Sequence, residues 1–392
     1  MSIARILTPP AHSFLLLGAR GTGKSTWLSQ HFRDAVFFDL LDERLFHRFL
    51  QRPHEFAEAL GALAPGQWVC VDEIQRLPNL LNEVHRHYER SKLNFALSGS
   101  SARKLRRAGV NLLAGRLLSK QMFPFVPQEL GADFSLERAL SIGTLPIVWT
   151  APEPQETLRS YVSLYLKEEI QAEAIVRDLA GYARFLPTAA LMHAQVINVA
   201  SLARDTGVSR ATVDSYLSIL EDTLLAFRLP ATEDMLRVRQ KRHPKLYWID
   251  AGLVRTLRGE LTLPLGNSLG ALFEGFIANL LRVEASTHRS FETMSYWAAA
   301  GSRIEVDFLL HRGPERVAIE VKASDRIRPE HLKGLRALAA LEGLRRRVLV
   351  YTGDTPRRTE DGIDIWPLDL FLQRLAAQTL FEHESTQSEV RA

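Results

Sequence analysis

Cysteine is almost absent from this chain. Cys70 is the single cysteine in 392 residues, so no disulfide can form within it. A lone thiol is typical of proteins in a reducing compartment, and we expect a cytoplasmic location. No apolar run reaches the roughly 18 residues that span a bilayer, and the apolar piece near the start leads into a glycine-rich segment. We therefore expect neither a membrane partner nor a signal peptide.

A strong charge of either sign is also missing. The 49 Lys and Arg residues against 45 Asp and Glu residues leave a net charge of +4, which is compatible with nucleic acid as a partner. The hydrophobic share of 46% is enough for real cores, and the length suggests two or three domains. We find no internal repeat and no biased tract except a polar tail at 381–392.

A glycine-rich segment at 18–25 fits the pattern G-x-x-x-x-G-K-[ST] of a phosphate-binding loop. An apolar stretch at 14–17 predicts a strand before it, and a helix is expected after it. Glycines let backbone N–H groups approach phosphate oxygens, where a Cβ would collide. Lys24 would contact the β- and γ-phosphates and Ser25 would ligate Mg²⁺, whereas the alternative is a flexible surface loop. The predicted nucleotide contacts in this segment are Gly18, Gly21, Thr22, Gly23, Lys24, Ser25 and Thr26.

Two carboxylates follow the apolar stretch 67–71, which predicts a buried strand. Asp72 would hold Mg²⁺ directly or through water, and Glu73 would polarise the water that attacks the γ-phosphate. A solvated turn is the alternative. Another predicted strand at 35–40 lies between the two nucleotide motifs, and with the adjacent glutamate it favours the ATPase branch of phosphate-loop proteins. The guanine-reading pattern Asn-Lys-x-Asp is absent, so we expect ATP with Mg²⁺.

Hydroxyls end the next predicted strand, 93–97. Ser98 and Ser100 are both candidates for sensing the γ-phosphate, or they cap a helix that begins near residue 102. Arg116 is a candidate arginine finger that would act in a neighbouring subunit, which implies a homo-oligomer. A plain surface arginine is the alternative, and other arginines compete for the role: Arg103, Arg106 and Arg107.

The stretch 199–217 has the spacing of a helix-turn-helix, with Ala203 at the crossing, Gly207 in the turn and Val213 in the second helix. Three residues at the start of the second helix would face DNA: Arg210, Thr212 and Ser215. The alternative is that this helix-turn-helix belongs to a winged domain that serves as a lid or as an oligomer contact. The basic run 237–245 is a candidate wing or phosphate contact, or else a solvated loop.

Two alternating stretches, 304–310 and 317–322, flank a turn at 312–315 and predict a hairpin. A hairpin symmetric about Gly313 and Pro314 places Asp307 opposite Glu320 and Glu305 opposite Lys322. Period two then puts all four charges on one face and the apolar residues 304, 306, 308, 319 and 321 on the other.

Like charges directly opposite each other are destabilising, so a cation between Asp307 and Glu320 would relieve the strain. This is the D…E-x-K arrangement of metal-dependent nucleases: Asp307 and Glu320 would hold Mg²⁺ against the scissile phosphate, and Lys322 would steady the attacking water. Glu274, on a helix-like stretch, would be a further ligand. The alternative is a half-exposed hairpin with solvated charges.

Several segments taken together resemble a family of prokaryotic AAA+-like ATPases that carry a C-terminal domain related to PD-(D/E)XK nucleases. They are 18–25, 68–78, 98–101, 114–116, 245–253, 272–274, 296–297, 305–307 and 320–322. The resemblance implies a P-loop α/β core with a parallel sheet, a helical and winged-helix middle, and a restriction-endonuclease-like α/β domain. The sequence departs from the family's pattern at Ser98 and Ala251, where the family usually has Thr.

These observations lead to one hypothesis and two alternatives. The hypothesis is an ATP-hydrolysing, oligomeric, DNA-associated enzyme with a Mg²⁺-dependent nuclease-like domain. The first alternative is a nucleotide-switched DNA-binding regulator with an inert nuclease fold, and the second is an ATPase that acts on protein partners. The predicted domains are an ATPase domain at 1–135, a helical and winged region at 136–235, a nuclease-like domain at 236–380 and the tail at 381–392.

Overall fold

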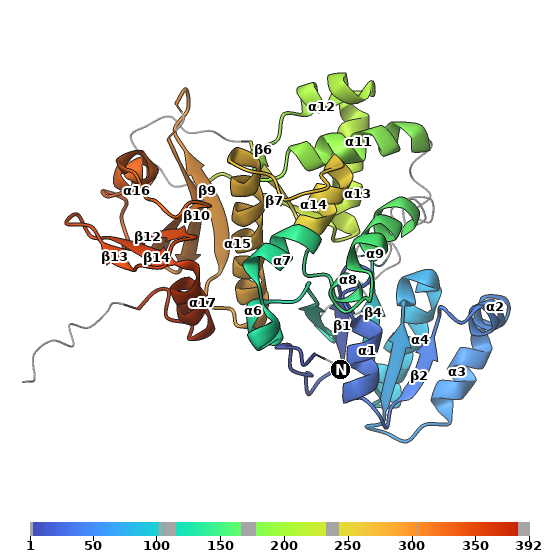
Figure 1. Ribbon diagram of the computed structural model, residues 1–392. Coiled ribbons are helices and arrows are strands. Elements are labelled where there is room, and N and C mark those ends of the chain that lie inside the picture. The colour runs from blue at the N-terminus through green and yellow to red at the C-terminus, as the bar shows by residue number, and fades with distance from the viewer. Residues whose placement is uncertain are drawn as a thin grey trace, which may run out of the picture. The chain divides into compact units, whose positions relative to one another are not determined.

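The computed structural model describes residues 3–101, 105, 115–165, 178–232, 243–302 and 304–382 (Figure 1). The chain divides into two compact units that do not follow chain order. Unit 1 comprises Met1–Leu130, Ile142–Ala183 and Ala211–Ala226, and unit 2 comprises Gly131–Ser141, Arg184–Arg210 and Phe227–Ala392. The domain boundaries expected from the sequence remain predictions.

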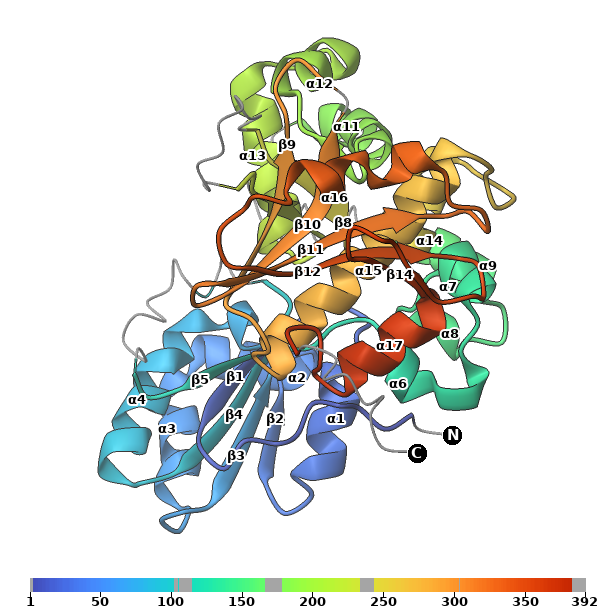
Figure 2. The ribbon, with the colours of Figure 1, turned by 90° about the vertical axis from the view of Figure 1, so that its left-hand side faces the viewer.

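Unit 1 is built on a five-stranded parallel sheet, as the sequence predicts. Its order is β2-β3-β4-β1-β5, and Figure 2 shows β1 between β4 and β5. Because all strands run the same way, the segments that follow β1, β3 and β4 leave the same edge of the sheet. The strands are β1 (Phe14–Leu17), β2 (Val36–Asp39), β3 (Trp68–Asp72), β4 (Asn94–Gly99) and β5 (Leu118–Gln121).

The helices of this unit begin at clear local signals. The Asp42 carboxylate caps α2 by accepting from the N–H groups of Arg44 and Leu45, and Pro53 is the first residue of α3. Two 3₁₀ turns, Ile74–Arg76 and Pro78–Leu80, follow β3 before α4 begins at Leu81. These helices and the further elements of the unit are α1 (Lys24–His31), α2 (Glu43–Gln51), α3 (Pro53–Gly61), α4 (Leu81–Arg90), α6 (Pro127–Leu130), α8 (Pro146–Trp149), α9 (Pro154–Ser160) and the π-helical turn η5 (Tyr161–Tyr165).

The middle of the chain contains the predicted helix, turn and helix in sequence. α12 (Val199–Thr206) is capped by Asn198 and ends at Gly207, whose φ of 70° a glycine adopts without strain, and α13 (Arg210–Asp222) follows. Residues 233–242, which hold most of the predicted wing, lie outside the described residues. The neighbouring elements are α7 (Leu136–Ile142), α11 (Leu179–Leu191), β6 (Gln195–Val196), β7 (Ala226–Leu229), β8 (Lys245–Trp248) and α14 (Ala251–Arg258).

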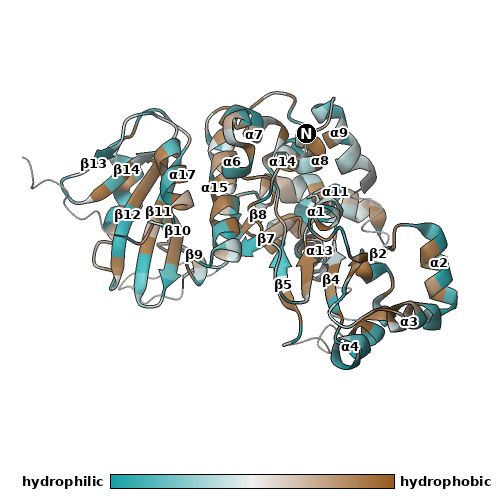
Figure 3. Ribbon diagram, turned by 90° about the horizontal axis from the view of Figure 1, so that it is seen from below, coloured by the Kyte–Doolittle hydropathy of each residue, from teal (hydrophilic) through white to brown (hydrophobic). Residues whose placement is uncertain are grey.

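Unit 2 contains a mixed six-stranded sheet of order β13-β14-β12-β11-β10-β9. Antiparallel pairs join β9, β10 and β11, whereas β12 pairs in parallel with both β11 and β14. Its central strands carry hydrophobic stretches flanked by polar ends (Figure 3). The elements are α15 (Asn267–Thr287), β9 (Thr293–Ala298), β10 (Glu305–Arg312), β11 (Glu315–Lys322), α16 (Lys333–Ala337), β12 (Leu344–Tyr351), β13 (Arg357–Arg358), β14 (Ile363–Pro367) and α17 (Leu368–Ala376).

The predicted hairpin of β10 and β11 is present in the predicted register, with Phe308 paired to Ile319 and Arg312 to Glu315. The predicted assignment of faces is wrong in one respect. A bulge opposite β9 shifts the register between Val306 and Leu309, so Val306 joins the core cluster with Leu309 while Phe308 packs near Tyr247. The hairpin is also not half-exposed, because β10 and β11 lie inside the sheet and are mostly buried.

Among the described residues, no helix is both long enough and apolar enough to cross a membrane.

Gly334 in α16 provides a test of how tightly unit 2 is packed. A Cβ at this position would lie 1.8 Å from the carbonyl oxygen of Glu305, so Gly334→Ala must displace backbone. We expect this overpacking to cost about 1–3 kcal/mol of unfolding free energy, measured by urea denaturation. Gly270→Ala in α15 is the control, because no atom lies within 4 Å of its added Cβ. Equal stability of the two variants would contradict the packing argument.

Candidate nucleotide site and the C-terminal acidic cluster

The phosphate-loop segment lies between β1 and α1, as predicted. Gly23 precedes the helix with a φ of 88°, a left-handed conformation that favours glycine. At Gly18 the constraint is space, since a Cβ there would lie 2.6 Å from the carbonyl oxygen of Met122. Thr22 is fully buried and its hydroxyl donates to the carbonyl of Ala19. The loop ends at the N-terminus of α1, where the free backbone N–H groups and the helix dipole favour anions.

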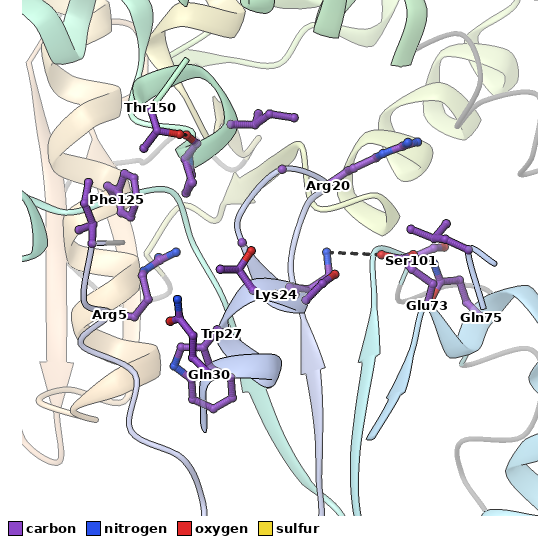
Figure 4. A pocket seen from close by; sticks show the side chains of 18 of the residues that line it. Arg5, Arg20, Lys24, Trp27, Gln30, Glu73, Gln75, Ser101, Phe125 and Thr150 are labelled. Atoms are coloured by element: carbon purple, nitrogen blue, oxygen red, sulfur yellow. Dashed lines mark hydrogen bonds and ion pairs between the residues drawn. The ribbon is translucent and has the colours of Figure 1, made fainter. Parts of the chain in front are cut away.

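Lys24 has only 4% of its surface exposed. Its ammonium donates to the carbonyl oxygens of Gly18 at 2.7 Å and Ala19 at 3.3 Å. Its Nζ also lies 3.8 Å from Oε1 of Glu73 (Figure 4). Lys24 is thus placed between the loop and the carboxylates that follow β3.

Asp72 ends β3 in a buried position. The Ser98 hydroxyl at the end of β4 donates to its carboxylate, and the backbone N–H of Glu73 donates to the Ser98 hydroxyl at 3.1 Å. Burial raises the pKa of Asp72, while hydrogen bonds from Ser25 and Ser98 act in the opposite direction. A buried carboxylate beside the Ser25 hydroxyl is a donor set that fits Mg²⁺.

Glu73 adopts a φ of 54°, which is uncommon for a residue other than glycine. Its Oε2 accepts from the Ser100 hydroxyl at 3.0 Å and from the Gln75 amide. The Gln75 amide also donates to Ser100 at 2.9 Å. Ser98 and Ser100, between which the sequence does not choose, therefore contact different carboxylates. Gln75 is a site residue that the sequence analysis does not identify, and its only signal in the sequence is its place two residues after Glu73.

A pocket of about 880 Å³ opens beside the loop. Lys24, Ser25, Thr26 and Glu73 are among the predicted residues that line it. The other lining residues include Ile3, Arg5, Trp27, Gln30, Gln75, Phe125, Ile147 and Thr150 (Figure 4).

Arg5 ties the N-terminal segment to the loop, which the sequence does not indicate. Its guanidinium donates to the carbonyls of Thr22 at 2.7 Å and Phe123 at 2.6 Å. It also pairs with the buried carboxylate of Glu129 at 2.8 Å. No sequence pattern links residues so far apart in the chain.

Two residues beyond 135 also hold the loop. The N–H of Ile147 donates to the Gly21 carbonyl at 3.2 Å, and the Tyr161 hydroxyl donates to the Arg20 carbonyl at 3.0 Å. The segment 142–165 is therefore part of the surroundings of the nucleotide site within unit 1.

The candidate arginine finger Arg116 does not line this pocket. Its Nε pairs with Oε1 of Glu89 at 2.5 Å on an exposed part of unit 1. The competing arginines at 103, 106 and 107 lie outside the described residues. A role of Arg116 in a neighbouring subunit stays a prediction.

The predicted carboxylates of unit 2 lie in one group, which we call the acidic cluster: Glu274, Glu305, Asp307 and Glu320. Asp307 and Glu320 are buried, Glu274 is half-buried, and 36% of the Glu305 side chain is exposed. Lys245 is also in the cluster, although the sequence suggests a wing or solvated loop for this residue. With 2% of its side chain exposed, its Nζ lies 3.0 Å from Glu274, 3.2 Å from Asp307 and 3.5 Å from Glu305. The expectation for Lys245 is therefore wrong, because β8 places it inside the unit.

The second lysine of the acidic cluster, Lys322, donates to Oε1 of Glu320 at 2.5 Å and lies 4.0 Å from Asp307. Burial raises the pKa of Glu274 to about 7 and raises that of Glu320 well above its ordinary value. Burial alone would also raise the pKa of Asp307, but the charges of Lys245 and Lys322 hold it below its usual range.

The predicted metal ligands of the acidic cluster, Glu274, Asp307 and Glu320, do not fit Mg²⁺ as they are placed. Within the described ranges, no three His, Cys, Asp or Glu side chains form a group that could hold a metal ion. Glu274 and Asp307 instead each accept a hydrogen bond from the Lys245 ammonium, at 3.0 Å and 3.2 Å.

The predicted DNA contacts begin α13. Arg210 is exposed, and Thr212 and Ser215 are half-buried. All three lie in the first two turns of the helix, as expected.

Family models match three consecutive parts of the chain. Residues 11–131 match a model described as "AAA domain". Residues 11–131 form an AAA+-like ATPase domain. Residues 133–264 match "Domain of unknown function (DUF8612)" and residues 269–371 match "Domain of unknown function (DUF4143)". The last two descriptions name no activity, and the relation of residues 269–371 to nucleases stays an expectation from the resemblance.

Two curated relatives are each 25% identical to this chain over 312 residues. They are the uncharacterized proteins Mb2031c of Mycobacterium bovis and Rv2008c of Mycobacterium tuberculosis, and the match covers 78% of this chain and 69% of each relative.

Solved structures that resemble the chain include the Orc1 protein of Aeropyrum pernix in complex with DNA, at 12% identity and a TM-score of 0.28. That match covers 69% of this chain and 89% of the other. The replication initiator DnaA bound to AMPPCP and single-stranded DNA matches at 12% identity and a TM-score of 0.28, over 55% and 83% of the chains. Protein VC1899 from Vibrio cholerae matches at 14% identity and a TM-score of 0.23, over 94% and 97%. Scores in this range do not establish a common fold over the matched length.

The tie between Arg5 and Glu129 allows a direct test of how the loop is supported. Arg5→Ala removes the cation beside a Glu129 side chain that is 2% exposed and leaves that carboxylate only the backbone N–H groups of Ile6 and Val126. We expect unit 1 to lose about 3 kcal/mol of unfolding free energy. Arg159→Ala, which breaks an exposed pair with Glu156, should cost less than about 1 kcal/mol. Both are measured by urea denaturation, and a similar loss in the two variants would show that the Arg5 pair has no special weight.

Proposed function

We propose that the AAA+-like ATPase domain binds ATP with Mg²⁺ and hydrolyses it. The observation that carries this proposal is the meeting of Lys24, Asp72 and Glu73 at the edge of the sheet where β1 and β3 end, beside the 880 Å³ pocket. A loop of amides, a lysine and two carboxylates is the set of groups that phosphoryl transfer needs.

In the proposed complex the loop amides and Lys24 bind the β- and γ-phosphates. Lys24 now rests on the carbonyls of Gly18 and Ala19, which are weaker partners than a phosphate, so ATP would draw its ammonium away. Ser25 and Asp72 would hold Mg²⁺, which supplies positive charge against the β- and γ-oxygens when bound. The side of the pocket lined by Arg5, Trp27, Phe125 and Ile147 would receive the nucleoside.

For hydrolysis, Glu73 orients the attacking water and accepts its proton. Ser100 and Gln75 fix the carboxylate of Glu73 by hydrogen bonds, and Ser98 fixes Asp72. Either serine can sense the γ-phosphate if its hydroxyl bonds to that phosphate in the ATP complex and returns to its carboxylate after hydrolysis. Arg116 would complete the site of a neighbouring subunit in a homo-oligomer.

Two substitutions separate binding from hydrolysis. We expect Lys24→Ala to weaken ATP binding by at least about 10-fold, because a charge-assisted contact to phosphate is lost. Glu73→Gln should keep ATP affinity and lower kcat by on the order of 10²–10⁴-fold, since the general base is removed. ATP turnover and binding of a fluorescent ATP analogue are the measurements.

Arg90→Ala, at the exposed end of α4, is the control and should keep both properties. Turnover at the wild-type rate in either Lys24→Ala or Glu73→Gln rejects the proposed site.

A second candidate function is DNA binding at the start of α13. The specific observation in its favour is the exposed Arg210 at the start of α13, directly after the glycine turn. Phosphate contacts from such a residue would be sensitive to salt. DNA binding is expected both of a nucleotide-switched regulator and of a DNA-associated enzyme.

If Arg210 contacts a phosphate, Arg210→Ala should weaken binding to duplex DNA uniformly across sequences. It should also lower the slope of log K against log salt by about 1. Fluorescence anisotropy at several salt concentrations measures both quantities. The comparison is Arg138→Ala. Arg138 is an exposed residue of α7, and its loss should leave the slope unchanged. No salt-sensitive DNA binding by the wild type would favour a protein partner instead.

The Mg²⁺-dependent nuclease of the initial hypothesis is not part of this proposal. Its candidate residues Asp307, Glu320 and Lys322 lie together, but Asp307 already contacts Lys245 and Glu320 already pairs with Lys322. No cleavage step is derived for them.

A further inference from the structure

The acidic cluster of unit 2 brings together side chains from four separate elements. Glu274 comes from α15, Glu305 and Asp307 from β10, and Glu320 from β11, while Lys245 enters from β8. Isolated charges are rarely buried without compensation, because leaving water costs several kcal/mol per ion. The cluster therefore needs a resident positive charge.

Lys245 meets this need with its three N–H donors. Its Nζ lies 3.0 Å from Oε1 of Glu274, 3.2 Å from Oδ1 of Asp307 and 3.5 Å from Oε1 of Glu305. The ring of Tyr296 lies below it, with the centroid 5.4 Å away. An ammonium among three carboxylates and an aromatic face is fully compensated.

Two of these carboxylates accept further hydrogen bonds. Oδ2 of Asp307 accepts from the backbone N–H of Val321 at 2.9 Å. Oε1 of Glu274 accepts a second hydrogen bond, from the Tyr247 hydroxyl at 2.5 Å. Tyr247 lies two residues after Lys245 on β8, so both side chains leave the same face of the strand.

We infer that Lys245 is the built-in cation of the acidic cluster, occupying the position at which Glu274, Glu305 and Asp307 would otherwise hold a divalent metal ion. Wild-type unit 2 then holds the cluster without metal, and loss of the ammonium exposes a divalent-cation site. Lys322 cannot substitute for Lys245, because it pairs with Glu320 and lies 4.0 Å from Asp307. This inference concerns unit 2 and does not depend on the proposed ATPase function.

The test uses the full chain without nucleotide and Mn²⁺ alone as the probe. Lys245→Met keeps the apolar stem and removes the charge. We expect the wild type to show no Mn²⁺ site that requires Asp307, and Lys245→Met to bind one additional Mn²⁺ by calorimetry. Mn²⁺ should raise the unfolding temperature of this variant by roughly 5 °C. Adding Asp307→Asn to Lys245→Met should abolish both gains.

Lys322→Met is the matched control, since it removes the other lysine of the acidic cluster and should gain no Mn²⁺ site. Lys245→Gln, which keeps a hydrogen-bond donor, replaces Lys245→Met if that variant does not fold. The inference is overturned by any of three results: a wild-type Mn²⁺ site that Asp307→Asn removes, no gain in the Lys245 variants, or an equal gain in Lys322→Met.

Discussion

The pairing of a buried lysine with nearby carboxylates is the interaction on which both sites depend. Lys24 lies near Glu73 in the AAA+-like ATPase domain, and Lys245 lies among Glu274, Glu305 and Asp307 in unit 2. In both places the lysine has almost no exposed surface. Because a buried charge without a partner is costly, each lysine constrains the positions of the segments that carry its carboxylates.

The two lysines differ in what surrounds them. Lys24 faces a large pocket and its hydrogen bonds are to backbone carbonyls, which a more strongly charged ligand can replace. The partners of Lys245 are carboxylates. Oε1 of Glu274, which accepts from Lys245, also accepts from Tyr247, and the second oxygen of Asp307 accepts from Val321. The same kind of residue thus suits ligand exchange in one unit and permanent charge compensation in the other.

Much of the first site could be predicted from the sequence because its signals are local. The loop at 18–25 and the carboxylates after β3 each follow an apolar strand, and a parallel sheet brings such strand ends to one edge. Arg5, Ile147 and Tyr161 could not be found in this way. They donate hydrogen bonds to backbone carbonyls of the loop from distant parts of the chain, and such contacts leave no pattern in the sequence.

The hairpin shows where local reasoning ends. Alternation and the turn at Gly313 determined the register of β10 and β11, since both are short-range properties of the chain. Only the tertiary structure decided that a bulge turns Phe308 away from Val306, and that Lys245 enters the acidic cluster from β8. The sequence by itself therefore determined the strands, the turns and the phosphate loop. The identity of the cation beside Asp307 depended on a strand 62 residues away, because charge compensation acts through space and not along the chain.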